Sequence, residues 1–223
     1  MGRSLVIFDC DGVLIDSEII SARMLIEALA TRGVIIDLPY VARHFLGRSY
    51  PVVMQQIRNE FGLDLPASFE DDYRDRLLEG FRAGLQIMPH VDEVITQLAI
   101  PCCVATSSSP RRVEFSLRLV GLWDRLGDRV FTASQVAHGK PAPDLFLFAA
   151  QQMGFAPKDC LVIEDSLTGV AAAHAAGMEV WRFTGGSHMA GLDLIEPAPA
   201  RADLRFASFA EFFQIAPDAK RQP

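Results

Sequence analysis

The sequence predicts an α/β protein in which a parallel β-sheet forms the core and a helical domain is inserted after the first strand. Short apolar runs rich in β-branched residues recur along the chain, each followed by a polar turn and a longer segment with helical spacing. These runs are apolar on both faces, as in buried parallel strands. One long interval near the amino terminus has helical spacing throughout and contains no such run.

The predicted strands are short and dominated by Val, Ile, Leu, Phe and Cys. They are Leu5–Phe8, Cys102–Ala105, Val130–Phe131, Leu161–Ile163 and Val180–Phe183. Segments between them have the length of crossover helices, and a glycine follows each as an expected C-terminal stop. These helices are Val113–Val120, Asp144–Met153 and Thr168–Ala176, followed by Gly121, Gly154 and Gly177. This alternation is typical of βα units in a parallel sheet.

The helical interval lies between the first two predicted strands. Its helical stretches include Ser17–Arg32, Pro51–Phe61 and Phe69–Phe81. We therefore predict an inserted helical domain over residues 16–84, with an α/β core formed by residues 1–15 and 85–223. At 223 residues the chain is long enough for one sizeable core and a second, smaller one.

Composition restricts the classes of partner. With 50% hydrophobic and 22% charged residues, the chain can bury enough apolar surface to fold as a globular protein. A net charge of -7 argues against broad binding to nucleic acids or anionic membranes, which favour basic surfaces. No stretch reaches the roughly 18 apolar residues of a membrane span, and the start of the chain does not resemble a signal peptide, so we expect a cytoplasmic protein. The cysteines, Cys10, Cys102, Cys103 and Cys160, lack metal-ligand spacing and are interpreted as reduced core thiols.

Reactive side chains cluster where the predicted strands end, which is where a parallel α/β sheet binds its ligands. They are Asp9 and Asp11 after the first strand, Thr106, Ser107 and Ser108 after the second, Lys140 in a Gly/Pro-rich loop, and Glu164 and Asp165 after the Leu161–Ile163 run. Because these strand ends meet at one edge of the sheet, we expect the side chains to converge.

This set of groups suits phosphoryl transfer, which needs a nucleophile, a proton shuttle, a divalent cation and fixed positive charge. Two carboxylates spaced i, i+2 at a strand end, Asp9 and Asp11, can reach one pocket, where one attacks phosphorus and the other handles the leaving-group proton. Magnesium prefers oxygen ligands, which Asp9 and Asp165 offer. Lys140 would neutralise part of the crowded negative charge.

The same motifs, in this order along the chain, resemble those of the haloacid dehalogenase (HAD) superfamily. The residues that carry the resemblance are Asp9–Glu18, Thr106, Gly139–Asp144 and Glu164–Gly169. The sequence is most similar to the subgroup that contains β-phosphoglucomutase and 6-phosphogluconate phosphatase. The resemblance covers essentially the whole chain and implies a Rossmann-like parallel sheet with a helical cap.

The resemblance also implies a role for each reactive residue and Mg²⁺ as the cofactor. Asp9 would be the nucleophile, Asp11 the general acid/base, Thr106 a hydrogen-bond donor to the phosphoryl group, and Lys140 a positive clamp on it. Ser107 and Ser108 would add phosphate donors. Candidate metal ligands are Asp9, Asp11, Glu164 and Asp165.

The predicted function is a phosphatase of a small phosphorylated metabolite, first among them a sugar or sugar-acid phosphate, that forms an aspartyl-phosphate. A phosphomutase is the alternative, although the positions that carry His and Arg in β-phosphoglucomutase-like caps are here Ser21 and Tyr50. A catalytically inert binding protein is a third alternative, but no reactive position is missing. The core residues alone do not separate phosphatase from mutase.

Arg48 and the histidines receive separate interpretations. Arg48 follows a glycine in the helical domain and is a candidate contact for a remote anionic group of the substrate, with an exposed helix arginine as the alternative. The histidines have no mutual metal spacing and are interpreted as surface or helix residues; they are His44, His90, His138, His174 and His188. A monomer is the expected oligomeric state.

Overall fold

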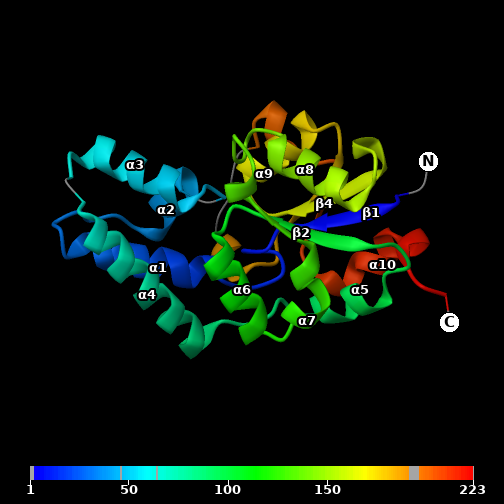
Figure 1. Ribbon diagram of the computed structural model, residues 1–223, viewed down its shortest axis with the longest axis horizontal. Coiled ribbons are helices and arrows are strands. Elements are labelled where there is room, and N and C mark those ends of the chain that lie inside the picture. The colour runs from blue at the N-terminus through cyan, green and yellow to red at the C-terminus, as the bar shows by residue number, and fades with distance from the viewer. Residues whose placement is uncertain (1–2, 46, 64, 191–195, 223) are drawn as a thin grey trace.

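The computed structural model describes residues 3–45, 47–63, 65–190 and 196–222. Its strands form one parallel six-stranded sheet in the order β3-β2-β1-β4-β5-β6 (Figure 1). The strands are β1 (Leu5–Phe8), β2 (Cys102–Thr106), β3 (Val130–Thr132), β4 (Cys160–Glu164), β5 (Glu179–Phe183) and β6 (Leu204–Phe206). The α/β prediction is confirmed. Only β6 was not predicted, because this edge strand is three residues long and gives no apolar run.

Strand β1 lies at the point where the strand order reverses, with β2 on one side and β4 on the other. In the register of the sheet Phe8 pairs with both Val104 and Ile163, so Asp9, Ala105 and Glu164, which follow these positions, lie at the same level at one edge of the sheet. Such a switch point is where open α/β sheets bind their ligands.

Alternate residues of each strand face opposite sides of the sheet, and each side packs against its own helices. Helices α8 (Asp144–Met153) and α9 (Leu167–Ala175) cover one side. Helices α5 (Val91–Gln97), α6 (Pro110–Leu119) and α10 (Phe212–Ile215) cover the other, together with the short α7 (Trp123–Leu126). The four cysteines are buried and unpaired, as predicted.

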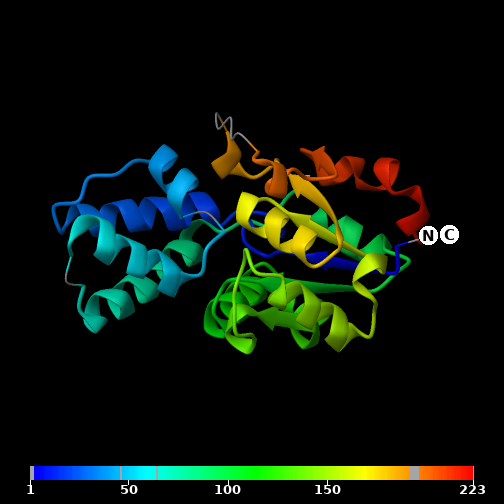
Figure 2. The ribbon, with the colours of Figure 1, turned by 90° about the horizontal axis from the view of Figure 1, so that it is seen from above.

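The remaining helices lie beyond the carboxyl end of β1, at one end of the molecule (Figures 1 and 2). They are α1 (Glu18–Ala30), α2 (Leu38–His44), α3 (Tyr50–Phe61) and α4 (Ala67–Gly84). The long helices α1, α3 and α4 match predicted stretches, whereas α2 is one of the short helices that were not predicted. Within the described ranges, no helix combines the length and apolar character needed to cross a membrane.

The chain enters and leaves these helices through two adjacent segments. Ile15 forms an antiparallel bridge with Ile87. The backbone N–H of Asp16 donates to the carbonyl of Gln86 at 2.9 Å, and that of Met88 donates to the carbonyl of Leu14 at 2.9 Å. The helical segment is therefore attached to the sheet by a pair of hydrogen-bonded connections.

Candidate active site at the carboxyl ends of the strands

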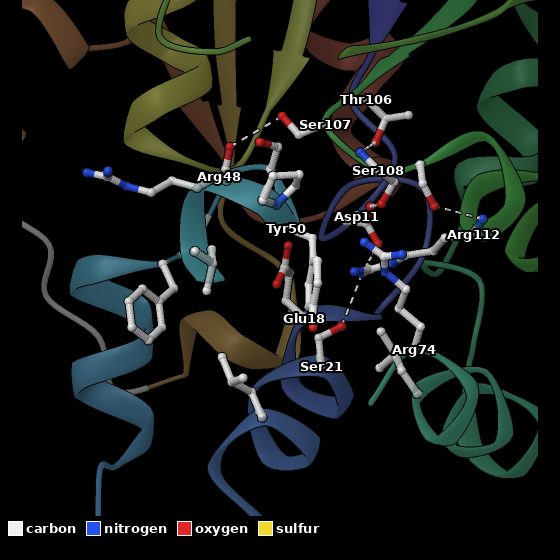
Figure 3. A pocket seen from close by; sticks show the side chains of 18 of the residues that line it. Asp11, Glu18, Ser21, Arg48, Tyr50, Arg74, Thr106, Ser107, Ser108 and Arg112 are labelled. Atoms are coloured by element: carbon white, nitrogen blue, oxygen red, sulfur yellow. Dashed lines mark hydrogen bonds and ion pairs between the residues drawn. The ribbon is translucent and has the colours of Figure 1, made fainter. Parts of the chain in front are cut away.

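A pocket of about 330 Å³ lies between the carboxyl ends of β1 and β2 and helices α1, α3 and α4 (Figure 3). Polar residues line its core side: Asp9, Asp11, Thr106, Ser107, Ser108 and Arg112. The helical side combines Glu18, Ser21, Tyr50 and Arg74 with apolar residues such as Leu25 and Met54. The pocket thus has a polar floor, as the sequence predicts for this edge of the sheet, and a largely apolar roof.

Asp9 and Lys140 form a buried ion pair at the floor of this pocket. The ammonium Nζ of Lys140 lies 2.9 Å from Oδ1 of Asp9 and 2.7 Å from Oε1 of Glu164. It also donates to the carbonyl of Ala105 at 3.2 Å. Three strand ends and a distant loop therefore meet at one lysine, which accounts for the convergence that the sequence predicts.

Burial and charge act in opposite directions on these groups. Burial raises the pKa of Asp9 well above its ordinary value, although the Lys140 ammonium acts to lower it. Burial by itself lowers the pKa of Lys140, but Asp9 and Glu164 outweigh it and raise the pKa. Lys140 therefore stays protonated and is the permanent positive charge of the site.

Both oxygens of Glu164 have partners. Oε1 accepts from Lys140, and Oε2 accepts from the backbone N–H of Ser166 at 2.7 Å and from its hydroxyl at 2.9 Å. The hydroxyl of Ser166 also accepts from the N–H of Gly169 and caps α9. A Cβ at Gly169 would lie 1.7 Å from Oε1 of Glu164, so this position of the motif accepts only glycine.

Asp9, Glu164 and Asp165 form an acidic cluster in which one ligand atom of each lies within 4.8 Å of the others. Three carboxylates with one ammonium leave a formal charge of -2 when all are ionised. Burial and the neighbouring Glu164 raise the pKa of Asp165 well above its ordinary value. A buried set of oxygen donors with excess negative charge has the chemistry of a site for a hard divalent cation.

The carboxylate of Asp11 lies outside this cluster and faces α6 (Figure 3). It accepts from the hydroxyls of Ser17 and Ser108 at 2.6 Å each and from Nη2 of Arg112 at 2.6 Å. Burial alone would raise the pKa of Asp11, but Arg112 and the two hydroxyls lower it below its ordinary value. Asp11 is therefore ionised in this arrangement.

Arg112 was not predicted from the sequence as a site residue. Ser109 accepts from the backbone N–H of Arg112 and caps α6, and Pro110 is the first residue of that helix. Arg112 is thus in the first turn, directly behind the Thr106–Ser108 segment. Its Nη2 also donates to the hydroxyl of Ser21 on α1 at 3.1 Å, so one guanidinium connects the core to the helical roof.

The predicted phosphate donors follow β2 at the pocket floor (Figure 3). Thr106 is buried, and its Oγ1 accepts from the backbone N–H of Ser108 at 3.0 Å. The hydroxyl of Ser107 donates weakly to the carbonyl of Gly47 at 3.4 Å. A Cβ at Gly47 would lie 2.3 Å from Oγ of Ser166, so the loop before α3 approaches the core closely on this side.

The helical-domain residues divide into two groups. Arg48 is exposed, and its guanidinium points away from Asp11 and Ser108, so the structure does not bring it to the polar floor (Figure 3). Tyr50 stacks on Tyr73 with ring centroids 5.3 Å apart. Arg74 lies over the Tyr50 ring at 4.9 Å and lines the pocket. Arg74 was not predicted as a site residue, and it borders the pocket together with Arg48.

His188 lies in a helix, but it is not at the surface, as the first of the two predicted alternatives would have it. His188 is buried, with Nε2 only 2.9 Å from Oδ2 of Asp165. It lies in the short 3₁₀ helix η4 (Ser187–Met189), four residues after the end of β5. Its position could have been suspected from the sequence, because it follows Gly185 and Gly186 at the carboxyl end of a predicted strand.

Glu18 is a half-buried carboxyl group in the middle of the pocket (Figure 3). Burial, helped by Asp11 and Asp165, raises its pKa from 4.5 to about 8. At a pH between these two pKa values, Glu18 has lost its proton in the unfolded chain but keeps it in the folded protein. The free energy of unfolding therefore falls as the pH rises through this range. Glu18 is therefore a source of instability at alkaline pH.

Replacing Glu18 with Gln removes this ionisation and keeps the shape of the side chain. We expect the variant to melt at a higher temperature than the wild type at pH 8.5, with the difference disappearing near pH 5. Circular-dichroism melts in EDTA over this pH range measure the effect. A difference in melting temperature that is the same at both pH values would contradict the assignment of the proton to Glu18.

Comparison with known proteins agrees with this site. The sequence matches the haloacid dehalogenase-like hydrolase family over residues 4–177. The chain belongs to this family. Its curated relatives include 6-phosphogluconate phosphatase of Escherichia coli, 27% identical over 82% of this chain and 83% of the relative, and a probable pseudouridine-5'-phosphatase of Drosophila melanogaster, 33% identical over 78% of each.

Solved structures of haloacid dehalogenase-like proteins share the whole fold. One of unknown function from Agrobacterium tumefaciens is 31% identical, with a TM-score of 0.79 over 97% of this chain and 99% of that one. The protein is thus an enzyme of the haloacid dehalogenase superfamily of the phosphatase type, like the curated relatives above.

Proposed function

We propose that the protein is a magnesium-dependent phosphatase that hydrolyses a small phosphorylated metabolite through an aspartyl-phosphate on Asp9. The observation that carries the proposal is the contact of Lys140 with Asp9, 2.9 Å long, at the floor of a pocket and inside an acidic cluster. A carboxylate held in this way has a fixed orientation, and the lysine offsets the charge of an approaching phosphate.

The acidic cluster fits Mg²⁺ through its oxygen donors and its excess negative charge. Asp9 and Asp165 would hold the ion, while Glu164, whose oxygens already accept from Lys140 and Ser166, would fix the lysine beside it. Bound there, Mg²⁺ would neutralise charge on the phosphoryl oxygens and on the cluster.

The chain's own groups account for the two chemical steps. An oxygen of Asp9 attacks phosphorus, the ester P–O bond breaks, and the alcohol leaves with a proton from Asp11. Water then attacks the aspartyl-phosphate and gives its proton to Asp11, which releases inorganic phosphate and restores Asp9. Thr106, Ser107 and Ser108 lie on the same side of the pocket as donors to the phosphoryl oxygens.

Asp11 must carry a proton for the first step, whereas Arg112 keeps it ionised without substrate. A phosphate dianion in the pocket adds negative charge beside Asp11 and competes for the Arg112 guanidinium. Both effects raise the pKa of Asp11. Substrate binding therefore favours the protonated form that the leaving group needs, and departure of the alcohol restores the base.

We also propose that residues 16–84 act as a cap on a core formed by residues 1–15 and 85–223. The antiparallel bridge between Ile15 and Ile87 gives the helices one hydrogen-bonded point of attachment. The contacts of Arg112 with Ser21 and of Ser107 with Gly47 cross from core to cap at the rim of the pocket. Closure of the cap would exclude water while the ester is cleaved.

Sugar and sugar-acid phosphates are the proposed substrates. The pocket has the size of a small-metabolite site. The roof offers Arg74 to a remote anionic group, because its ion pairs with Glu70 and Asp71 are long, at 3.6 and 3.9 Å. The relatives named for 6-phosphogluconate and pseudouridine phosphate give two starting compounds for a screen.

A phosphomutase is the second candidate, because a covalent aspartyl-phosphate serves both reactions. Ser21 and Tyr50, which the sequence places where mutase caps carry His and Arg, both line the pocket, and Ser21 accepts a hydrogen bond from Arg112. Neither side chain is a strong base or a cation at neutral pH. These two positions therefore lack the groups that would help to return a phosphoryl group to a second hydroxyl. This favours transfer to water.

A phosphate-release assay tests the proposal. Wild-type protein is incubated with Mg²⁺ or EDTA and a panel of sugar phosphates, 6-phosphogluconate and nucleoside monophosphates. We expect release that requires Mg²⁺ and ranks the compounds. The protein would instead be a phosphomutase if it isomerised glucose 1-phosphate in the presence of a bisphosphate primer and released phosphate from none of the compounds. Binding of these compounds without either reaction would indicate an inert binding protein.

Replacing Asp165 with Ala is expected to lower the affinity of the protein for Mg²⁺ while the fold persists. The variant loses one of two proposed direct ligands, so the Mg²⁺ concentration at half-maximal activity should rise by about tenfold or more. Titration of Mg²⁺ at saturating substrate measures this concentration. An unchanged half-saturation would contradict the assignment of Asp165 as a ligand.

A further inference from the structure

Asp165 is held differently from its neighbour Glu164. Its backbone carbonyl accepts from Nε of Arg182 at 2.8 Å, and Arg182 is itself paired with Glu196 at 2.6 Å. The backbone is thus anchored. In the side chain, Oδ2 is buried and has no hydrogen bond of good geometry with any described residue. A buried carboxylate oxygen needs a donor, and its orientation is undefined without one.

The nearest donor to this oxygen is the imidazole of His188. Nε2 lies 2.9 Å from Oδ2, and both groups are almost fully buried. The ring N–H is not aligned with the oxygen as a linear hydrogen bond, and neither ring nitrogen has another partner within the described ranges. A hydrogen bond from Nε2–H to Oδ2 would give each of these two atoms a partner.

The backbone around His188 is built to admit the ring at this place. A Cβ at Gly186 would lie 2.5 Å from Cε1 of the imidazole. A Cβ at Gly12, in the loop after Asp9, would lie 3.0 Å from the same carbon and 2.1 Å from Oδ2 of Asp165. Two glycines from distant segments therefore leave the space that the imidazole and the carboxylate share.

The segment that carries His188 is also fixed against the start of the helical domain. Ser187 donates its backbone N–H at 3.1 Å and its hydroxyl at 2.9 Å to Oδ1 of Asp16. Helix η4 also packs against α1. A neutral imidazole has one ring N–H to donate.

We propose that His188 is a positioning residue that donates Nε2–H to Oδ2 of Asp165 and so orients the carboxylate for Mg²⁺. With one oxygen held by the imidazole, the other is directed to the acidic cluster. Ordered ligands bind a cation more tightly, and loss of such an outer partner typically costs about 10- to 100-fold in metal affinity. The inference rests on the proposed function in one respect, the role of Asp165 as a metal ligand.

The test compares two substitutions of one residue. His188→Leu keeps much of the volume and removes the donor, whereas His188→Gln places an amide N–H at a similar reach. Mn²⁺ serves as the probe, and free Mn²⁺ is counted by electron paramagnetic resonance, without substrate or turnover. We expect His188→Leu to raise the Kd for Mn²⁺ by about tenfold or more, and His188→Gln to recover most of the loss. His174→Leu, which removes a histidine bonded to the carbonyl of Arg201, is the matched control.

Each outcome is decisive. Wild-type Mn²⁺ affinity in a folded His188→Leu variant would overturn the proposal, as would an equal loss in the Leu and Gln variants. Should the Leu variant not fold, the ¹⁵N shifts of the wild-type imidazole decide, because the proposal requires the Nε2–H tautomer and the Nδ1–H tautomer would refute it. The Asp165→Asn variant separates the two claims: retained Mn²⁺ affinity there refutes the metal role of Asp165 itself.

Discussion

Replacing Asp9 with Asn is expected to lower turnover by about a thousandfold or more, because the amide is not a nucleophile and cannot form the aspartyl-phosphate. The substitution keeps the volume of the side chain, and its carbonyl oxygen can still accept from Lys140. The fold should therefore persist. Steady-state phosphate release measures the loss, and a circular-dichroism melt confirms that the variant is folded.

A second readout separates loss of the nucleophile from a general disturbance of the site. After an acid quench, mass spectrometry should find a phosphoryl group on Asp9 in the wild-type protein and on no residue of the Asp9→Asn variant. Asp128→Asn makes the same chemical change at an exposed residue and should behave as the wild type. Substantial phosphatase activity in Asp9→Asn would exclude the covalent mechanism.

Replacing Lys140 with Met is expected to remove activity and to cost about 3–5 kcal/mol of stability at neutral pH, because it leaves buried carboxylates without their ammonium. Asp9 and Glu164 lose contacts of 2.9 and 2.7 Å, and both remain beside Asp165. Methionine fills a similar volume, so the loss is electrostatic rather than a cavity effect.

The loss of stability should depend on pH and on the metal. The pKa of Asp9, which burial already raises, rises further without the lysine, so the folded variant keeps its proton to higher pH. The variant is therefore less destabilised at pH 5 than at pH 8. Mg²⁺ should restore part of the stability by replacing the missing charge.

Urea unfolding of the Lys140→Met variant at several pH values, with and without Mg²⁺, measures these effects. Lys158→Met removes an exposed lysine and is the matched control. Equal stability of Lys140→Met and the wild type at pH 8 would mean that the buried carboxylates are neutral in the folded protein, which would contradict the ion pair.

Much of the fold follows from local patterns in the sequence. The runs Leu5–Phe8 and Asp144–Met153 are observed with the predicted ends, because a buried strand and an amphipathic helix each need only their own residues to show their periodicity. Gly121, Gly154 and Gly177 have positive φ angles after their helices, as a C-terminal stop requires. The edge strand β6 was missed because three residues carry too little periodicity.

The reactive residues were also predictable, because the sequence marks the strand ends that carry most of them and the Gly/Pro-rich loop that carries Lys140. What the sequence did not give is which side chains meet around them. Arg112 and Asp11 are 101 positions apart, and their contact depends on the direction in which the first turn of α6 leaves the sheet. In the sequence, a charged helix residue that faces solvent looks the same as one that pairs with a distant side chain.

By itself, then, the sequence determined the α/β class, the motifs and the chemistry that those motifs support. Only the tertiary structure decided that Arg112 faces Asp11, that Arg74 lines the pocket, and that His188 is buried against Asp165. The physical reason is the range of the interactions. Hydrophobic periodicity and capping act between neighbours along the chain, whereas ion pairs and buried hydrogen bonds join segments that only the packed sheet brings together.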